Sequence, residues 1–150
     1  MTDRMHAGLD AWCSFFESLS PESLDRIGDL AVAELRFADP FNDVTGRDRV
    51  KALLAHMFGT LEAPRFRVTA RASDGATGLI RWRFTARRKG RTQPFTLEGM
   101  SEVTLAEDGR VLAHIDHWDP AAQLYERVRA SIDATHMEGE LKAEIVAQPE

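Results

Sequence analysis

The segment 114–119, with the sequence His-Ile-Asp-His-Trp-Asp, places four titratable side chains in one predicted strand. Successive residues of a strand point to opposite faces, so His114, Asp116 and Trp118 share one face. Titratable groups are costly to bury without partners or a purpose. If this face lines a pocket, the segment supplies an acid/base pair beside an aromatic wall.

The opposite register is an alternative, because Val111, Ala113 and Ile115 form a more apolar face of the same strand. A slip of one residue would turn His114 and Asp116 away from a pocket. A second alternative is that His114 is partly buried only as a structural partner of Asp116. The residue pattern alone leaves both alternatives open.

Length and composition indicate a soluble globular domain with one hydrophobic core. The chain has 150 residues, of which 43% are hydrophobic and 29% charged, and this length suits a single domain. No apolar run is long enough to span a membrane, and residues 1–10 lack the apolar core of a signal peptide. We therefore predict a cytoplasmic protein with no membrane partner.

Charge and cysteine content argue against two further kinds of site. The net charge is −5, and glutamates accompany the arginines of the second half, which disfavours nucleic-acid binding. Cys13 is the single cysteine, so it cannot form an internal disulfide and is expected in the core. No histidine or cysteine cluster has metal-ligand spacing, and neither a metal nor a cofactor is predicted.

The first half of the chain carries three apolar stripes of helical period, over 9–19, 24–31 and 50–58. Ser20-Pro21 is a typical N-cap followed by proline at the first helical position, and it starts the second, short helix. Thr45-Gly46-Arg47-Asp48 resembles a capping box for the third helix. Three N-terminal helices are therefore expected.

The second half changes to a period of two, which is typical of amphipathic strands. Apolar residues alternate with polar ones over 66–70, 80–86, 95–105 and 111–118. Asp108-Gly109 marks a tight turn between the last two of these strands. About four main strands are therefore expected.

A closing helix is predicted after the last strand. Asp119 before Pro120 is a typical N-cap arrangement, and an apolar stripe follows over 124–132. His117, on the face opposite Trp118, is predicted at the surface or at a subunit contact.

These elements predict an α+β fold. Its cone-shaped, curved mixed sheet of about four main strands is wrapped by the three N-terminal helices and followed by the C-terminal helix. No repeat or linker divides the sequence. Residues 1–150 are therefore expected to form a single domain, with a core over about 7–130 and a C-terminal extension over about 131–150.

Three motifs occur in an order typical of one superfamily. They are Phe37-Ala38-Asp39-Pro40-Phe41, Thr45-Gly46-Arg47-Asp48, and Asp108-Gly109-Arg110-Val111 leading to Trp118-Asp119. In these motifs the chain resembles the SnoaL-like branch of the nuclear transport factor 2-like superfamily, relatives of ketosteroid isomerase and polyketide cyclase. That superfamily includes isomerases, dehydratases, cyclases, epoxide hydrolases and non-catalytic binding proteins, so the fold does not determine the function.

By this resemblance Asp39 matches the catalytic base of ketosteroid isomerase and would shuttle a proton at an apolar cavity. The positions that match the isomerase's hydrogen-bonding tyrosine and protonated acid carry Phe15 and Ser101 instead. An enolate oxygen would then lack both expected donors. The alternative for Asp39 is a purely turn-forming role before Pro40.

The resemblance also directs His114 and Asp116 into the family cavity. Neutral His114 would remove or deliver a proton near pH 7, and a carboxylate of Asp116 or Asp39 would orient its ring. The predicted catalytic residues are Asp39, His114 and Asp116. The predicted ligand contacts are Phe15, Trp82, Phe84, Ser101 and Trp118.

We therefore predict binding of a small, largely hydrophobic molecule in an apolar cavity, with cofactor-free isomerase, dehydratase or cyclase chemistry. The alternative is a non-catalytic ligand-binding or oligomeric scaffold protein. Water activation for epoxide opening, as in limonene epoxide hydrolase, would use a carboxylate flanked by arginine. It ranks third, because Arg81 and Arg83 alternate onto the face opposite Trp82. The resemblance also implies a homodimer that pairs through the outer face of the sheet.

The loss of both oxyanion donors predicts negligible ketosteroid isomerase activity. Removing even one such donor typically costs about a hundredfold or more in rate. A standard assay with an unsaturated ketosteroid should therefore give turnover far below that of a dedicated isomerase. Comparable turnover would show that another group, such as His114, stabilises the oxyanion.

Overall fold

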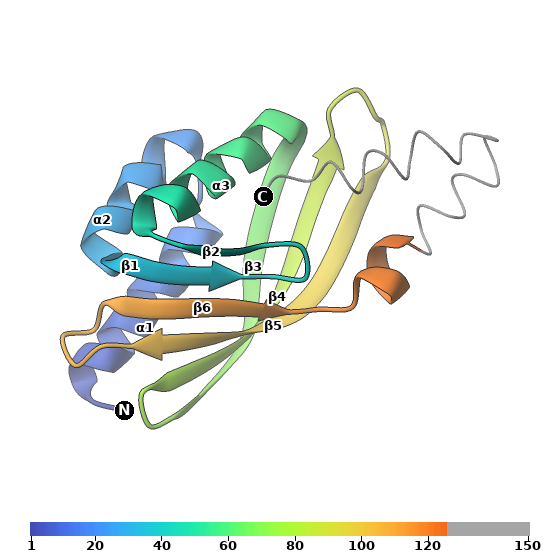
Figure 1. The fold of residues 1–150 in the computed structure, drawn as a ribbon. Coiled ribbons are helices and arrows are strands. Elements are labelled where there is room, and N and C mark those ends of the chain that lie inside the picture. The colour runs from blue at the N-terminus through green and yellow to red at the C-terminus, as the bar shows by residue number, and fades with distance from the viewer. Residues whose placement is uncertain (126–150) are drawn as a thin grey trace.

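The computed structural model describes residues 1–125, which form a curved six-stranded sheet with helices packed against it (Figure 1). The helical elements are α1 (Asp3–Glu17), the 3-10 helix η1 (Pro21–Arg26), α2 (Ile27–Leu30), α3 (Arg47–Thr60) and the π-helical turn η2 (Ala121–Tyr125). The strands are β1 (Ala31–Ala38), β2 (Asp43–Thr45), β3 (Leu61–Asp74), β4 (Thr77–Arg88), β5 (Pro94–Leu105) and β6 (Val111–His117). The predicted α+β class is confirmed.

The sheet is mixed, with the strand order β2-β1-β6-β5-β4-β3. Strands β3 to β6 form an antiparallel meander, whereas β1 runs parallel to β6. The strand that follows the first helices therefore lies beside the last strand of the sheet (Figure 1). This pairing places Phe37 of β1 next to His114 of β6.

Strands β1 and β2 were absent from the sequence prediction. The stripe over 24–31 was expected to be one helix, whereas Leu24 lies in η1 and Ala31 begins β1. The pairing of β1 with β6 shifts register between Ala31 and Arg36, so burial along β1 does not alternate regularly. A strand interrupted in this way has no clear period of two for a sequence pattern to reveal.

Two predicted helix ends differ from the structure. The N-cap of α3 is Gly46 and it makes no side-chain hydrogen bond, so the predicted capping box is wrong. Thr45, the expected capping residue, lies one residue before the N-cap and pairs with Arg36 as part of β2. Asp119 does cap the closing segment, because its Oδ1 accepts from the N–H groups of Ala121 at 2.9 Å and Ala122 at 3.3 Å. The predicted continuation of that helix beyond residue 125 lies outside the described residues.

Helix α1 covers the inner face of the sheet and contacts β3, β5 and β6. Its apolar stripe is buried, including Trp12 and Cys13, which are both fully inaccessible. Helix α3 packs mainly on β1. The helices therefore enclose one side of the sheet, which is where a cavity can form.

A bulge in β6 decides which side chains of this strand face the helices. Val111 pairs with Leu105 and Ala113 pairs with Thr104, so Leu112 is an extra residue between the two pairs. Leu112 is exposed, whereas Val111 before it and His114 after it are both buried. The bulge therefore lets residues from both competing faces of the sequence pattern turn inward.

Gly8 of α1 lies against Gly109 in the turn between β5 and β6. A Cβ atom at Gly8 would lie 1.9 Å from the carbonyl oxygen of Gly109. We therefore expect Gly8→Ala to lower the free energy of unfolding by about 1–3 kcal/mol, the usual cost of overpacking. Gly59→Ala in α3 is the matched control, since no atom lies within 4 Å of its Cβ position.

The control should raise the free energy of unfolding by up to about 1 kcal/mol, because alanine favours the helix. Denaturant unfolding of both variants measures the two changes. Equal changes in the two variants would contradict the close approach of α1 to the turn.

Candidate functional site

A cavity of about 490 Å³ lies between α3, the segment 39–42 and the inner face of the sheet. This volume is within the range of small-molecule sites, about 300–1,000 Å³. Most of its wall is apolar and aromatic, including Phe37, Phe66, Trp82, Phe84, Phe95 and Trp118. A ligand held here would contact mostly apolar side chains.

The structure places Asp39, His114 and Asp116 along this one cavity. They come from the end of β1 and from β6, which the parallel pairing brings together. Three of the predicted ligand contacts, Trp82, Phe84 and Trp118, also line the cavity.

Two predicted ligand contacts lie behind the cavity wall instead. Phe15 is fully buried and stacks on Trp12, with ring centroids 5.5 Å apart. Ser101 is 1% exposed and donates a hydrogen bond to Asp116. Neither lines the cavity, because α1 turns Phe15 into the core and the Asp116 carboxylate stands over Ser101.

His114 is held by hydrogen bonds at both ring nitrogens. The indole Nε1–H of Trp12 donates to Nδ1 at 2.9 Å, and Nε2 lies 2.6 Å from Oδ1 of Asp116. An indole nitrogen can only donate, so Nδ1 must accept and the proton of the neutral ring is on Nε2. The His114 ring is 4% exposed and stacks on Phe37 at 4.9 Å between centroids.

This arrangement restricts proton transfer by His114. An imidazolium ion donates from both nitrogens, so its second N–H would face the N–H of Trp12. Protonation of His114 therefore requires the 2.9 Å hydrogen bond with Trp12 to break. In this geometry Nε2–H donates to Asp116, and Nδ1 is occupied by the indole of Trp12.

The Asp116 carboxylate is fixed through one of its two oxygens. Oδ1 lies at hydrogen-bond distance from Nε2 of His114 and also accepts from the hydroxyl of Ser101, whose Oγ accepts from the indole of Trp82 at 2.8 Å. Both of these hydrogen bonds are made to Oδ1, and no residue in 1–125 is hydrogen-bonded to Oδ2. Since Asp116 lines the cavity, Oδ2 is the oxygen left for a ligand.

Asp39 forms a turn and also lines the cavity. Its Oδ1 accepts from the backbone N–H groups of Phe41 and Asn42, both at 2.7 Å, and the Asn42 amide donates to both oxygens at 3.1 Å. Burial raises the pKa of the Asp39 carboxyl, and the negative charge of Asp116 adds to this rise, although the hydrogen bonds oppose it. The turn-forming role and the cavity position therefore coexist.

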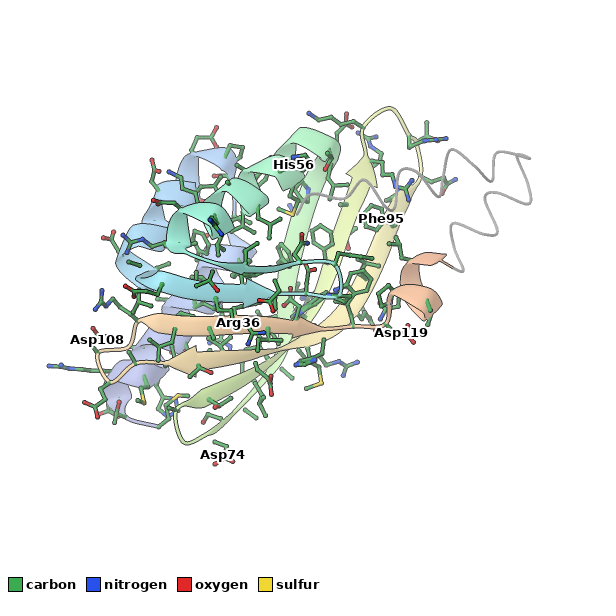
Figure 2. The ribbon with its side chains drawn as sticks, viewed as in Figure 1. Arg36, His56, Asp74, Phe95, Asp108 and Asp119 are labelled. Atoms are coloured by element: carbon green, nitrogen blue, oxygen red, sulfur yellow. The ribbon has the colours of Figure 1, made fainter. Side chains whose placement is uncertain are left out.

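The cavity lining includes basic residues that the sequence interpretation did not identify. Arg88 at the end of β4, and Lys89 and Arg91 in the turn after it, line the cavity, and His56 lines it from α3. His56 is exposed and lies on the same upper side of the molecule as Phe95 (Figure 2). The run Arg87-Arg88-Lys89-Gly90-Arg91 was the available signal for this group.

Residues 1–125 contain no group of three or more histidine, cysteine, aspartate or glutamate side chains placed to hold a metal ion. No helix in the same part of the chain is long and apolar enough to cross a membrane.

The raised pKa of Asp39 gives a prediction for stability against pH. Between the ordinary carboxyl pKa and the raised one, the folded protein binds more protons than the unfolded chain, so ionised Asp39 lowers the stability as the pH rises. Asp39→Asn cannot ionise and keeps an acceptor for the N–H groups of Phe41 and Asn42. We expect its melting temperature to rise relative to the unmodified protein as the pH increases from about 3 to 7.

Rotation of the Asn42 amide would also let its Oδ1, which is buried without a hydrogen bond among the described residues, pair with the new amide. Melting curves of both proteins over this pH range measure the difference. A difference that moves in favour of the unmodified protein with rising pH would mean that the pKa of Asp39 is lowered.

The chain was compared with known families, curated sequences and solved structures. The family model of the SnoaL-like domain matches residues 13–114. No curated protein sequence matches the chain.

Three solved structures illustrate the fold that the chain shares. A protein with a ketosteroid isomerase-like fold from Catenulispora acidiphila, in complex with trimethylamine, is 18% identical with a TM-score of 0.67, covering 79% of this chain and 89% of its own. An LEH-like epoxide hydrolase from M. tuberculosis is 17% identical with a TM-score of 0.67, covering 83% and 84%. An NTF2-like protein of unknown function from Burkholderia pseudomallei is 14% identical with a TM-score of 0.70, covering 83% and 97%.

At these identities the likeness to the solved structures shows the fold alone. The family model, by contrast, spans more than half of the chain. The motifs of β1 and the start of α3 lie within the matched residues, as do β3 to β5 and most of β6 up to His114. The chain therefore belongs to the SnoaL-like family, and it shares the fold of the NTF2-like protein among these structures.

Proposed function

We propose that this protein binds a small, largely apolar carbonyl compound in the cavity. Asp116 then removes a proton from the carbon next to the carbonyl group of that compound. The observation that carries this proposal is the Asp116 carboxylate, which lines an aromatic-walled cavity. One of its oxygens is held by His114 and Ser101, and the other is left for a ligand. A fixed carboxylate in a site removed from water is suited to act as a general base.

His114 acts in this proposal as a positioning residue. Its Nε2–H donates to Oδ1 of Asp116, while the indole of Trp12 occupies Nδ1, the other nitrogen of the ring. This role differs from the proton exchange that the sequence suggested for His114. It makes Asp116 the group that touches the reacting carbon.

Asp39 is proposed as the partner of the carbonyl oxygen. Burial raises the pKa of Asp39, which favours the neutral acid, and a neutral carboxylic acid can donate a hydrogen bond to a developing oxyanion. The C–H electron pair would move to the enolate oxygen as the proton moves to Asp116. Isomerisation, dehydration of a β-hydroxyl group and ring closure onto a second carbonyl can all begin from such an enolate.

Exchange of the α-proton with deuterium oxide tests this step without knowledge of the full reaction. A panel of apolar ketones and enones is incubated with the protein, and deuterium incorporation is followed by NMR. For any compound that exchanges, Asp116→Asn should reduce the rate by at least about a hundredfold, the usual contribution of general base catalysis. The neutral fluorophore phenylnaphthylamine (NPN) should bind this variant within about threefold of the unmodified affinity, because the cavity wall is unchanged.

His117→Gln is the matched control. His117 is on the exposed side of β6 and pairs with Glu102 at 3.1 Å, outside the cavity. Its exchange rate should equal that of the unmodified protein. Full exchange activity in Asp116→Asn would remove Asp116 as the base.

A non-catalytic binding protein is the second candidate, because the Trp12–His114 hydrogen bond is equally suited to a purely structural network. In that case NPN binds, no compound exchanges its α-proton, and His114→Gln mainly lowers the melting temperature. If NPN does not bind at all, both candidates fail.

A homodimer and a cytoplasmic location are further proposals. The outer face of the sheet supports the first, since Met100 and Leu112 on it are the large hydrophobic side chains that are exposed among the described residues, at 51% and 39%. Sedimentation of the purified protein tests the dimer, and fractionation of cells tests the location.

A further inference from the structure

Gly99 of β5 allows the indole of Trp82 to lie against the sheet. The two residues pair across β4 and β5. A Cβ atom at Gly99 would lie 2.5 Å from Cζ2 and 2.7 Å from Cη2 of the indole, which is too close for any residue with a side chain. An aromatic ring can cover a glycine on the neighbouring strand in this way and stabilise the pair.

Ser101 holds another atom of the same ring edge. Nε1 of Trp82 donates to Oγ of Ser101 at 2.8 Å, and Ser101 follows shortly after Gly99 on β5. The indole edge from Nε1 to Cη2 therefore runs along β5, although Trp82 belongs to β4. A ring attached in this way bridges two strands and lies across the sheet. Since Trp82 lines the cavity, it provides a flat floor there.

No aromatic ring of residues 1–125 is stacked on this floor. The ring contact of Trp82 is T-shaped, with Phe66, at 6.2 Å between centroids and 79° between planes. Two other rings of the cavity wall do have close ring neighbours, since Phe37 stacks on His114 at 4.9 Å and Phe84 lies 4.5 Å from Phe66. The indole is therefore available to stack on a ligand.

The floor adjoins the proposed base. Ser101 accepts from Trp82 and donates its own hydroxyl to Oδ1 of Asp116. The indole and the carboxylate are therefore connected through a single hydroxyl group, and both Trp82 and Asp116 line the cavity. A flat molecule stacked on the indole would lie beside the oxygen of Asp116 that is left for a ligand.

We propose that Gly99 is a specificity-determining residue of this cavity. By letting Trp82 lie flat, it selects carbonyl compounds whose ring system is planar and conjugated, such as aryl ketones, over saturated compounds with the same skeleton. The inference rests on the proposed binding of a carbonyl compound and names its chemical class. Stacking of one aromatic ring on another adds about twofold to tenfold in affinity beyond that of burial alone. A puckered saturated ring cannot lie flat on the indole and lacks this contribution.

Two ketones with the same fused-ring skeleton test the selection. The compound α-tetralone has an aromatic ring beside its carbonyl group, whereas α-decalone is fully saturated. Each ketone is used to displace NPN, and its Kd is calculated with the NPN affinity of the same protein variant. We expect the unmodified protein to bind α-tetralone at least about threefold more tightly than α-decalone.

Substitutions of Trp82 separate the flat ring from its N–H group. Trp82→Leu removes the ring, so the preference for α-tetralone should fall below about twofold. Trp82→Phe keeps a flat ring over Gly99 but cannot donate to Ser101, and it should keep a preference of at least about threefold. Neither variant adds atoms to the core, so the two together test the proposal even if Gly99→Ala does not fold.

Gly99→Ala tests the glycine itself. The new Cβ would displace the indole and would also lie 2.9 Å from the carbonyl oxygen of His117, at the end of β6. In the folded variant the preference for α-tetralone should fall below about twofold. The indole N–H of Trp82, identified in NMR spectra by its absence from Trp82→Phe, should exchange with deuterium oxide at least about tenfold faster, because its hydrogen bond to Ser101 is lost.

Gly59→Ala is the matched control. It makes the same change in α3, at a residue that does not line the cavity and has no atom within 4 Å of its Cβ position. Both the preference for α-tetralone and the exchange rate of the Trp82 indole N–H should equal those of the unmodified protein.

The outcomes separate this inference from the proposed function. Equal Kd values for the two ketones in the unmodified protein, or failure of both to displace bound NPN, overturns the inference. A preference that persists in Trp82→Leu also overturns it, because another part of the cavity then selects the ligand. A preference that persists in folded Gly99→Ala removes Gly99 as the determinant, and its loss in Trp82→Phe contradicts selection by a flat ring. Absence of NPN binding to the unmodified protein overturns the proposed function itself.

Discussion

The hydrogen bond from the indole of Trp12 to Nδ1 of His114 determines which ring nitrogen donates to Asp116. It leaves the ring proton on Nε2, which donates to Asp116. Asp116 also accepts a hydrogen bond from the hydroxyl of Ser101. Ser101 in turn accepts from Trp82. One chain of hydrogen bonds thus joins α1 to β6, β5 and β4, and its two ends are both indole groups that can only donate.

The aromatic surroundings give this polar network its chemical character. Stacking on Phe37 and burial under α1 exclude water from His114, while Asp116 keeps one side towards the cavity. Burial of the Asp39 carboxyl raises its pKa, so the two neighbouring carboxyl groups, Asp39 and Asp116, lie in different environments. A cavity of this kind can hold one group ready to accept a proton and another ready to donate a hydrogen bond.

Much of the fold and part of the site followed from sequence patterns. Period-two alternation predicted strands β3 to β6, and alternation together with the family resemblance directed His114 and Asp116 to the cavity side. The bulge at Leu112 was not predictable, because it changes which residues face inward without changing the composition of the strand. The role of Trp12 was also hidden, since an apolar helical stripe does not reveal that one indole N–H meets a residue 102 positions later. The basic lining residues Arg88, Lys89 and Arg91 were overlooked because charged residues at a turn usually face solvent.

The parallel pairing of β1 with β6 has a consequence for the order of folding. Strand β1 precedes α3 and strands β3 to β5. Its parallel partner β6 is therefore synthesised only after all of them. Pairings this distant in sequence require closure of a long loop and tend to form slowly. During synthesis the edge of β1 that pairs with β6, and the face of Phe37 that stacks on His114, must therefore wait until the last strand emerges. The cavity is then among the last parts of the molecule to assemble.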